Sequence, residues 1–420
     1  MSNSRSKIHH YVPRWYQKRF LPAGQNTLWY LDLRPESVCT GAVHYTRNAL
    51  HYWGPARCFY AEELYSMQFG ASITDVLETR LFGPVDRKGA AAVDFFRFYQ
   101  NPGEGMRESY RALIAYIGAQ KFRTPRGLDW LKRQVSSRDN TQTLLAMSAL
   151  FQAYETMWME GVWEIVHARR SNTKFIVTDD PVTFFNRRLI PNGVPPTGGD
   201  DFPKVGTRTI FPLAMDSCLI ITHLQLVRNP WHDPLRRREN ARSFQPTLAK
   251  FTDIQFGREL DEDEVLRINL ILKRSAARFI AAPSKDALYP ERRLAGVYWA
   301  DIDRDWFLFP NLWKVGFTTR IMVGYEDGGA WGMDEYGRNP WHPDFEDEGR
   351  RRLEHRRFDE GKREWAKKRI GKSLARVPDL DREDRVGDLM MNSYLRDNGL
   401  LPREDTATPE GAGGSPGQFE

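Results

Sequence analysis

The sequence has few cysteines and no long apolar run, which excludes several classes of protein. Cys39, Cys58 and Cys218 are odd in number and far apart, so neither a disulfide framework nor a Cys-x-x-Cys metal knuckle is available. No apolar stretch reaches the roughly 18 residues of a membrane span, and the N-terminal segment lacks the apolar core of a signal peptide. We therefore expect a cytoplasmic protein without a membrane partner.

A strong charge imbalance and the common nucleotide-binding motifs are also lacking. The 420 residues include 61 Lys and Arg against 55 Asp and Glu, and this net charge of +6 could attract phosphates or simply aid solubility. The sequence offers no context for a GxxxxGK[ST], HExxH, GxSxG or GxGxxG motif. The sequence therefore gives no support for a nucleotide-binding fold, a zinc protease of the HExxH type or a hydrolase with a GxSxG nucleophile elbow.

Aromatic residues are plentiful instead. The chain has 13 Trp, 16 Tyr and 24 Phe, and 41% of its residues are hydrophobic, which excludes a mainly disordered protein. A chain of this length can hold more than one domain. We expect a sizeable buried core.

Hydrophobic periodicity predicts a mixture of helices and strands. Apolar residues at helical spacing begin at Ile73 and recur around Ile117, where Pro125 should end the helix. The fold class we predict is α+β or α/β, with a helix-rich middle packed on a small sheet. Further helices are expected over residues 143–169 and 261–282, and strands over residues 26–33, 174–178, 207–213 and 217–224.

The composition changes twice toward the C-terminus, and this suggests three parts. Residues 1–289 form the predicted core domain. Residues 290–376 are predicted to be an appended unit, with two or three aromatic strands followed by a charged helix over residues 344–376. Residues 377–420 form a mostly extended or disordered tail. We expect no internal repeat, and the charged helix suggests a solvated surface.

The first candidate site is the segment KIHHYVPRWYQKRF near the N-terminus. His9 and His10 point to opposite faces if the segment is a strand, so at most one of them faces a shared site. Arg14 and Arg19 follow, interleaved with aromatic residues, as in a segment that holds an anionic or aromatic ligand. The alternative is a histidine that only packs and hydrogen-bonds internally.

The same segment resembles the first half of an HNH nuclease motif, with Asn26 as a conceivable middle residue. The remainder does not fit, because a third histidine is expected about nine residues later and position 35 is a proline.

The second candidate is VTDDPVTFFN, which should be a strand that runs into a turn. Asp179 and Asp180 could bind Mg²⁺ or Mn²⁺ or position a water, although such a pair is also an ordinary capping device. Thr178 and Asn186 could support either role. Because the two carboxylates alternate, one could be catalytic while the other holds the turn.

The third candidate is AQKFRTP, which places Arg123 at the end of a helix. A cation at this position is favoured by the helix alone. With Gln120 nearby, however, the guanidinium could clamp a phosphate or a carboxylate.

In chain order, the segments HHYVPRWYQKRF, QKFRTP, FIVTDDPV with FPLAMDSCLIIT, and INLILKRSAARFI resemble an uncharacterised bacterial family headed by an HHYVP motif, domain of unknown function four-two-three-eight. The resemblance covers residues 7–283. The family usually has Asp-Asn-Pro where this chain has Asp179, Asp180 and Pro181, which puts Asp180 in doubt as a site residue. The resemblance implies positions rather than a reaction: His9, His10, Pro13, Arg123, Thr124, Pro125, Asp179 and Pro181.

These observations lead to two main functional hypotheses. The first is a hydrolase, such as a metal-dependent phosphodiesterase or nuclease, that acts on nucleic acid or a nucleotide as a bacterial toxin or defence effector. His10 would be the base or a metal ligand, Asp179 would hold Mg²⁺ or Mn²⁺, and Arg14 with Arg123 would clamp phosphate. The alternative is a non-catalytic module that binds nucleic acid or a partner protein. A structural protein with internal polar networks is the third hypothesis.

Overall fold

The structure is a computed structural model of the chain. The residues that it describes are 8–40, 43–62, 67–69, 72–74, 82–134, 151, 153–189, 201–238, 254–316, 321–324, 326, 328, 330–334, 338–345 and 347–370.

A five-stranded sheet forms the centre of the fold. Its strand order is β11-β12-β13-β9-β14, and every neighbouring pair is antiparallel except the parallel pair of β9 and β14. All residues of β9, β12 and β13 are buried, so both faces of these strands are covered. The bounds are β9 Val162–His167, β11 Thr183–Phe185, β12 Arg208–Ala214, β13 Ser217–Thr222 and β14 Gln255–Glu259.

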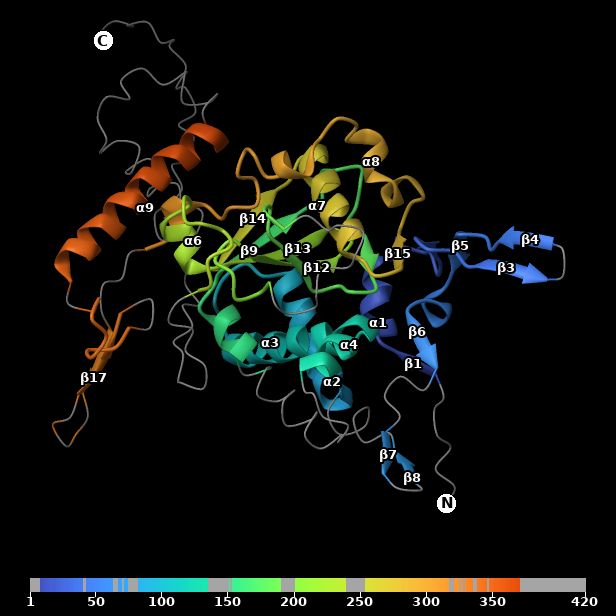
Figure 1. The fold of residues 1–420 in the computed structure, drawn as a ribbon, viewed down its shortest axis with the longest axis horizontal. Helices are drawn as coiled ribbons and strands as arrows, with labels where there is room; N and C mark the ends of the chain where they lie inside the picture. Colours follow the sequence, from blue (N-terminus) through green and yellow to red (C-terminus); the bar gives the residue numbers. More distant parts are fainter. Residues whose placement is uncertain are drawn as a thin grey trace, which may run out of the picture. The chain divides into compact units, whose positions relative to one another are not determined.

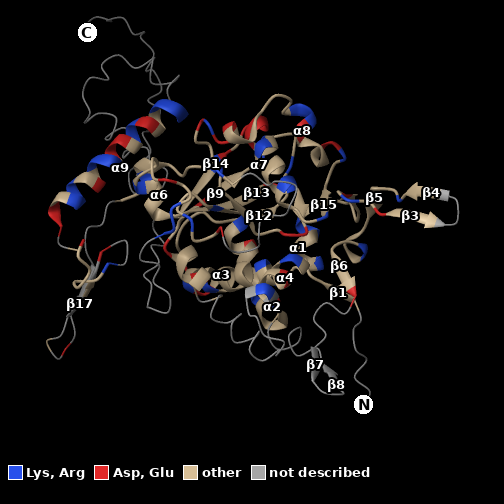
Figure 2. Ribbon diagram, in the orientation of Figure 1, with Lys and Arg blue, Asp and Glu red and all other residues tan. Residues whose placement is uncertain are grey.

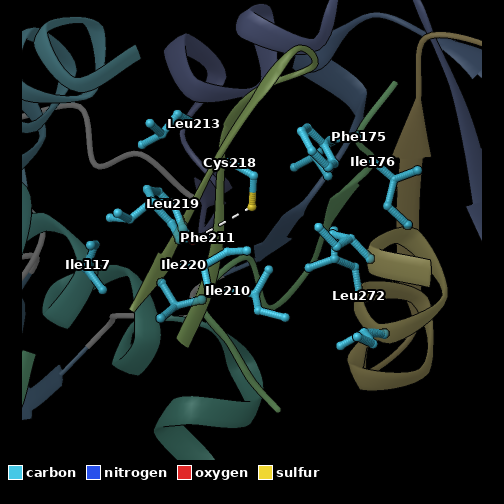
Figure 3. Close-up of a cluster of buried hydrophobic side chains, with 14 of the residues drawn as sticks. Ile117, Phe175, Ile176, Ile210, Phe211, Leu213, Cys218, Leu219, Ile220 and Leu272 are labelled. Carbon is cyan, nitrogen blue, oxygen red and sulfur yellow. Dashed lines mark hydrogen bonds between the residues drawn. The ribbon is translucent and has the colours of Figure 1, made fainter. Parts of the chain in front are cut away.

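Helices cover the two faces of this sheet. Figure 1 shows α2, α3 and α4 on one side and α7 on the other. In the core, Ile117 of α3 and Leu272 of α7 lie on opposite sides of β12 and β13 (Figure 3), and both residues are fully buried. The bounds are α1 Arg14–Gln17, α2 Gly83–Arg97, α3 Met106–Phe122, α4 Pro125–Gln134, α6 Leu224–Arg228, α7 Glu262–Ser275, α8 Pro290–Arg293 and α9 Glu348–Arg369.

A second, antiparallel sheet brings distant segments together. Its order is β10-β15-β2-β5, with β10 Val177–Thr178, β15 Phe279–Ala282, β2 Leu28–Asp32 and β5 Leu50–Trp53. The aspartates that follow β10 therefore lie beside the segment between α7 and β15. The remaining strands form pairs: β1 Ile8–His10 with β6 Tyr60–Glu62, β3 Ser37–Thr40 with β4 Val43–Thr46, β7 Met67–Phe69 with β8 Ser72–Thr74, and β16 Ile321–Gly324 with β17 Ala330–Met333.

The predicted α+β fold is confirmed, and several elements begin or end where their local signals indicate. Helix α3 has Arg123 as its C-cap, directly before the Thr-Pro pair. Helix α7 begins with a capping box, in which Asp261 accepts a hydrogen bond of 2.8 Å from the backbone of Glu264.

Three predicted helical segments are wrong in part. Residues 162–167 form strand β9 rather than the end of a helix, because a short apolar run does not distinguish a buried strand from a buried helix. Helix α7 ends at Ser275, and residues 279–282 form β15. Ile73 lies in β8, and the rest of that predicted helix lies outside the described residues.

The core continues past residue 289. Ile302, Phe307 and Leu308 are buried in the same hydrophobic cluster as the central sheet. The region predicted as aromatic strands begins with short 3-10 turns over Trp299–Asp301 and Leu312–Lys314, and only later forms β16 and β17. The predicted charged helix is present as α9. Contacts group residues 1–370 as one compact unit, and the predicted tail lies outside the described residues.

Candidate functional site

The HHYVP and QKFRTP segments are joined by a buried hydrogen-bond chain. The Arg123 Nε donates to the Gln120 Oε1 at 2.7 Å, and the Gln120 Nε2 donates to the Tyr11 carbonyl at 2.9 Å. A second nitrogen of Arg123 donates to the Asp86 carboxylate on α2 at 2.8 Å. Arg123 and Gln120 are both buried. Arg123 therefore orients the amide that holds the HHYVP backbone in place.

A buried ion pair joins QKFRTP to the two aspartates. The Lys121 Nζ lies 2.8 Å from the Asp180 carboxylate and also donates to the Val182 carbonyl at 2.9 Å. Arg126 lies 3.6 Å from the same carboxylate. Burial lowers the pKa of Lys121, and the negative charge of Asp180 opposes this shift. Neither Lys121 nor Arg126 was among the predicted site residues.

Asp179 binds the backbone between α7 and β15. Its carboxylate accepts hydrogen bonds from the backbone N–H groups of Ala277, Arg278 and Phe279, at 2.8, 2.6 and 2.9 Å. Burial raises the pKa of Asp179 to about 6, although the three N–H donors favour the charged form. The observed role of this carboxylate is to hold a turn. We call Tyr11, Gln120, Lys121, Arg123, Asp179 and Asp180 the motif centre.

Thr178 and Asn186 support the backbone at two different places. The Thr178 hydroxyl accepts a hydrogen bond of 3.2 Å from the backbone N–H of Asp180, so it stabilises the turn after β10. The Asn186 side chain donates to the Pro234 carbonyl at 2.8 Å and thereby holds a more distant loop.

The two histidines lie on opposite faces of β1, as strand alternation requires. His9 is buried, whereas His10 is partly exposed. The His10 Nε2 lies 3.2 Å from the Ala56 carbonyl oxygen, and its ring packs 5.8 Å from the Tyr60 ring. Burial lowers the pKa of His10, and the charge of Arg14 lowers it further. At neutral pH the imidazole is therefore uncharged.

The two arginines of the first segment have different surroundings. Arg14 is exposed at the start of α1. Arg19 is held by two hydrogen bonds of 2.9 and 2.6 Å to the Asp94 carboxylate of α2, and its guanidinium lies 4.6 Å above the Trp15 ring. Arg19 therefore fastens the first segment to α2.

The predicted residues do not share one set of partners. His10 contacts Ala56 and Tyr60, whereas Arg123 and Asp179 are engaged at other points of the core. Within the described residues, no cluster of three His, Cys, Asp or Glu side chains could hold a metal ion. Metal binding by His10 or Asp179 stays a prediction.

A second candidate site lies far from these motifs in the sequence. It is a cavity of about 770 Å³ between α6, the loop that follows it and the N-terminal half of α9. We call it the arginine cavity, because six arginines line it. The lining residues are Val205, Gln225, Arg228, Asn229, His232, Arg236, Arg237, Arg338, Asp347, Gly349, Arg350, Leu353, Glu354 and Arg357.

Three of the six arginines build the walls of the cavity. The Arg338 guanidinium makes two hydrogen bonds, of 3.0 and 3.1 Å, to the Glu354 carboxylate and another bond to Asp334. Arg350 pairs with Asp344 at 2.5 Å. The Arg228 guanidinium lies 4.4 Å above the Phe358 ring.

The other three arginines are exposed at the cavity. They are Arg236, Arg237 and Arg357. Arg357 pairs with Glu360 at 2.8 Å, and the two side chains are 48% and 34% exposed, so water competes for this pair. Figure 2 shows basic residues on α6 and along α9, with a basic C-terminal end of α9.

This site was not predicted from the sequence, because the α9 segment has the composition of a solvated helix surface. The available signal was the pair of arginine triplets at residues 236–238 and 350–352. A triplet by itself is typical of an exposed helix face or loop. Only the packing of α9 against α6 brings the two regions to one cavity.

No family model, curated protein or solved structure matches the chain. The resemblance to the HHYVP family therefore stays a prediction. Among the helices that the structure describes, none is long and apolar enough to cross a membrane.

Proposed function

We propose that this chain binds a phosphate-containing ligand of the nucleic-acid or nucleotide class in the arginine cavity. The observation that carries the proposal is the number of guanidinium groups that meet at one cavity: among the described residues its lining has six arginines and His232 against Asp347 and Glu354. Asp334, Asp344 and Glu360, which pair with Arg338, Arg350 and Arg357, lie outside the lining. Guanidinium groups match phosphate oxygens in geometry and keep their charge at all physiological pH values.

The arrangement of the arginines supports binding. Arg228 and Arg338 are buried and held by protein groups, so the walls are ordered without a ligand. Arg236, Arg237 and Arg357 are exposed at the same cavity, where a ligand can reach their guanidinium groups. A site with ordered walls loses less conformational entropy when it binds.

A charge reversal at the cavity tests the proposal. We expect Arg357→Glu to weaken binding of inorganic polyphosphate about tenfold at low salt, because it removes one phosphate contact and adds a repulsive charge. The dependence of log K on log salt should also become less steep, as it does when a phosphate contact is lost. Isothermal titration calorimetry at several salt concentrations measures both effects.

Arg352→Glu is the matched control. Arg352 lies on the same helix, is exposed and pairs with the exposed Glu348 at 3.0 Å, and it is not among the described residues that line the cavity. This variant changes the net charge equally and should bind polyphosphate within about twofold of wild type. Equal losses in the two variants would show general attraction to a basic surface and would contradict a site at the cavity.

Hydrolysis near His10 is a second candidate function. The observation in its favour is an uncharged, partly exposed imidazole beside the exposed Arg14. With the Nε2 proton donated to the Ala56 carbonyl, the Nδ1 lone pair is the base. Mg²⁺ or Mn²⁺, if used, would have to compete with the three N–H donors for Asp179.

The two histidines should respond differently to replacement by alanine. We expect His10→Ala to fold normally and, if the chain is a hydrolase, to lower phosphodiesterase activity by about 10². We expect His9→Ala to lower the free energy of unfolding by roughly 1 to 3 kcal/mol, because His9 is buried in the core. Activity on a chromogenic phosphodiester and urea unfolding measure the two effects. Wild-type activity in a folded His10→Ala variant would exclude His10 as the base.

We propose that the protein acts in the cytoplasm. All three cysteines are free thiols, with Cys58 and Cys218 buried and Cys39 exposed. An exposed free thiol is compatible with a reducing compartment.

A further inference from the structure

A five-residue sequence, Arg-Asn-Pro-Trp-His, occurs twice in the chain, at residues 228–232 and 338–342. Our expectation that the sequence has no internal repeat is therefore wrong. The repeat was missed because it is short and its two copies are far apart, whereas repeat architectures have a fixed period.

The two copies adopt the same turn. In the first, the Asn229 side-chain oxygen accepts a hydrogen bond of 3.1 Å from the backbone N–H of Trp231. In the second, the Asn339 oxygen accepts a bond of 3.1 Å from Trp341. The backbone N–H of each histidine also donates to the carbonyl of the asparagine in its own copy, at 3.1 and 2.9 Å. Asparagine followed by proline favours this geometry.

Each turn buries its arginine and exposes its tryptophan. Arg228 and Arg338 are 1% and 4% exposed, and both line the arginine cavity. Trp231 and Trp341 are 49% and 83% exposed. A tryptophan that served only to stabilise the fold would bury its ring, because burial of the ring is what stabilises. Packing explains part of Trp231, whose ring lies 6.1 Å from the buried Trp306 ring, but it leaves about half of that side chain and most of Trp341 exposed.

We propose that the two turns make the arginine cavity a site for single-stranded nucleic acid, with bases stacked on Trp231 and Trp341 and phosphates bound by the cavity arginines. This inference rests on the proposed function and names its ligand class. Both turns border the cavity through their arginines, and Asn229 and His232, on either side of Trp231, line it as well. The two indoles are not lining residues themselves, so we place the stacked bases on the turns beside the cavity and the phosphates inside it.

The chemistry favours a single strand over other polyanions. An unpaired base offers a flat face that can stack on an exposed indole, and stacking of this kind is tolerant of base identity. The bases of a duplex are already stacked inside the helix, and inorganic polyphosphate has none. The exposed Leu353 among the lining residues adds an apolar contact that a purely ionic ligand would not use.

The experiment compares a fluorescein-labelled oligothymidine of about 12 nucleotides with a duplex of the same length and with inorganic polyphosphate. We expect Trp231→Ala and Trp341→Ala each to weaken oligothymidine binding about 5- to 30-fold, as the loss of one stacked base does. Binding of the duplex and of polyphosphate should change less than about twofold, and Trp→Phe variants should recover most of the affinity because phenylalanine also stacks.

Two controls make the outcomes distinct. Tyr298→Ala removes another exposed aromatic ring, 75% exposed and outside the two repeated turns, and should leave binding unchanged. Arg357→Glu should weaken the binding of all three ligands. If it does so while both tryptophan variants bind oligothymidine like wild type, stacking is overturned and phosphate binding stands. If neither kind of variant changes binding, both proposals fail. Tighter binding of an acidic peptide such as polyglutamate than of oligothymidine would overturn the single-strand assignment in favour of a protein partner.

Discussion

Replacing Asp180 by asparagine should lower the free energy of unfolding by about 3 to 5 kcal/mol, the usual cost of removing one partner from a buried ion pair. The Lys121 ammonium is 4% exposed and would lose the carboxylate 2.8 Å away, whose charge opposes the effect of burial on the pKa of this lysine. Arg126, 3.6 Å from the same carboxylate, would lose a nearby opposite charge as well. Urea unfolding followed by circular dichroism measures the loss.

Two further variants show whether burial causes this loss. Asp216→Asn breaks a pair with Arg97 in which both side chains are more than a fifth exposed, at 3.1 Å. That change should cost about 1 kcal/mol or less. The double variant Lys121→Met with Asp180→Leu removes both charges and should recover part of the stability lost in Asp180→Asn. A cost below about 1 kcal/mol for Asp180→Asn would contradict a stabilising role for the carboxylate.

The second large effect is expected at Asp179. Asp179→Ala removes the acceptor of three backbone N–H groups, and each buried donor left without an acceptor costs about 1 to 3 kcal/mol. We expect the free energy of unfolding to fall by at least about 3 kcal/mol, with or without Mg²⁺. Asp179→Asn keeps one acceptor oxygen and should lose less.

The same variants distinguish a structural carboxylate from a metal ligand. A metal ligand would make wild-type stability rise with added Mg²⁺ or Mn²⁺, and Asp179→Asn would abolish that rise. A structural carboxylate gives losses that do not depend on the metal. Normal stability of Asp179→Ala together with loss of a metal-dependent activity would assign Asp179 to the reaction instead.

If these results are obtained, the motif centre stabilises the fold by holding distant segments together. Gln120 and Lys121 lie in the last turn of α3, and Arg123 is its C-cap. Gln120 and Arg123 hold the HHYVP backbone, while Lys121 holds the turn after β10. One helix end thereby fastens two segments that are far apart in the sequence, and Asp179 fastens a third. This network resembles the third hypothesis drawn from the sequence, a set of satisfied internal polar groups.

The motif positions were predictable from the sequence, but their roles were not. The spacing of QKFRTP before a proline placed Arg123 at a helix end, and the structure has it there. Nothing local indicates that its partner is Gln120 rather than a phosphate, since both accept the same hydrogen bonds. Likewise, a carboxylate that follows a strand can bind either a metal ion or several backbone N–H groups, and the local sequence is the same in both cases.

The helix ends and strands that could be predicted from the sequence are those set by residues close together in the chain. The capping box at Asp261 and Glu264 and the end of α3 before Thr124 and Pro125 act within a few residues. The apolar runs of β12 and β13 pair with each other and lie next to each other in the sequence. Features that depend on residues far apart in the sequence, such as β9 and the arginine cavity, became visible only in the tertiary structure. Val162–His167 became β9 because strands were available on both sides of it. Arg228 and Arg338 came to line one cavity because α6 and α9 pack together, and no local pattern encodes the side on which a charged helix is covered.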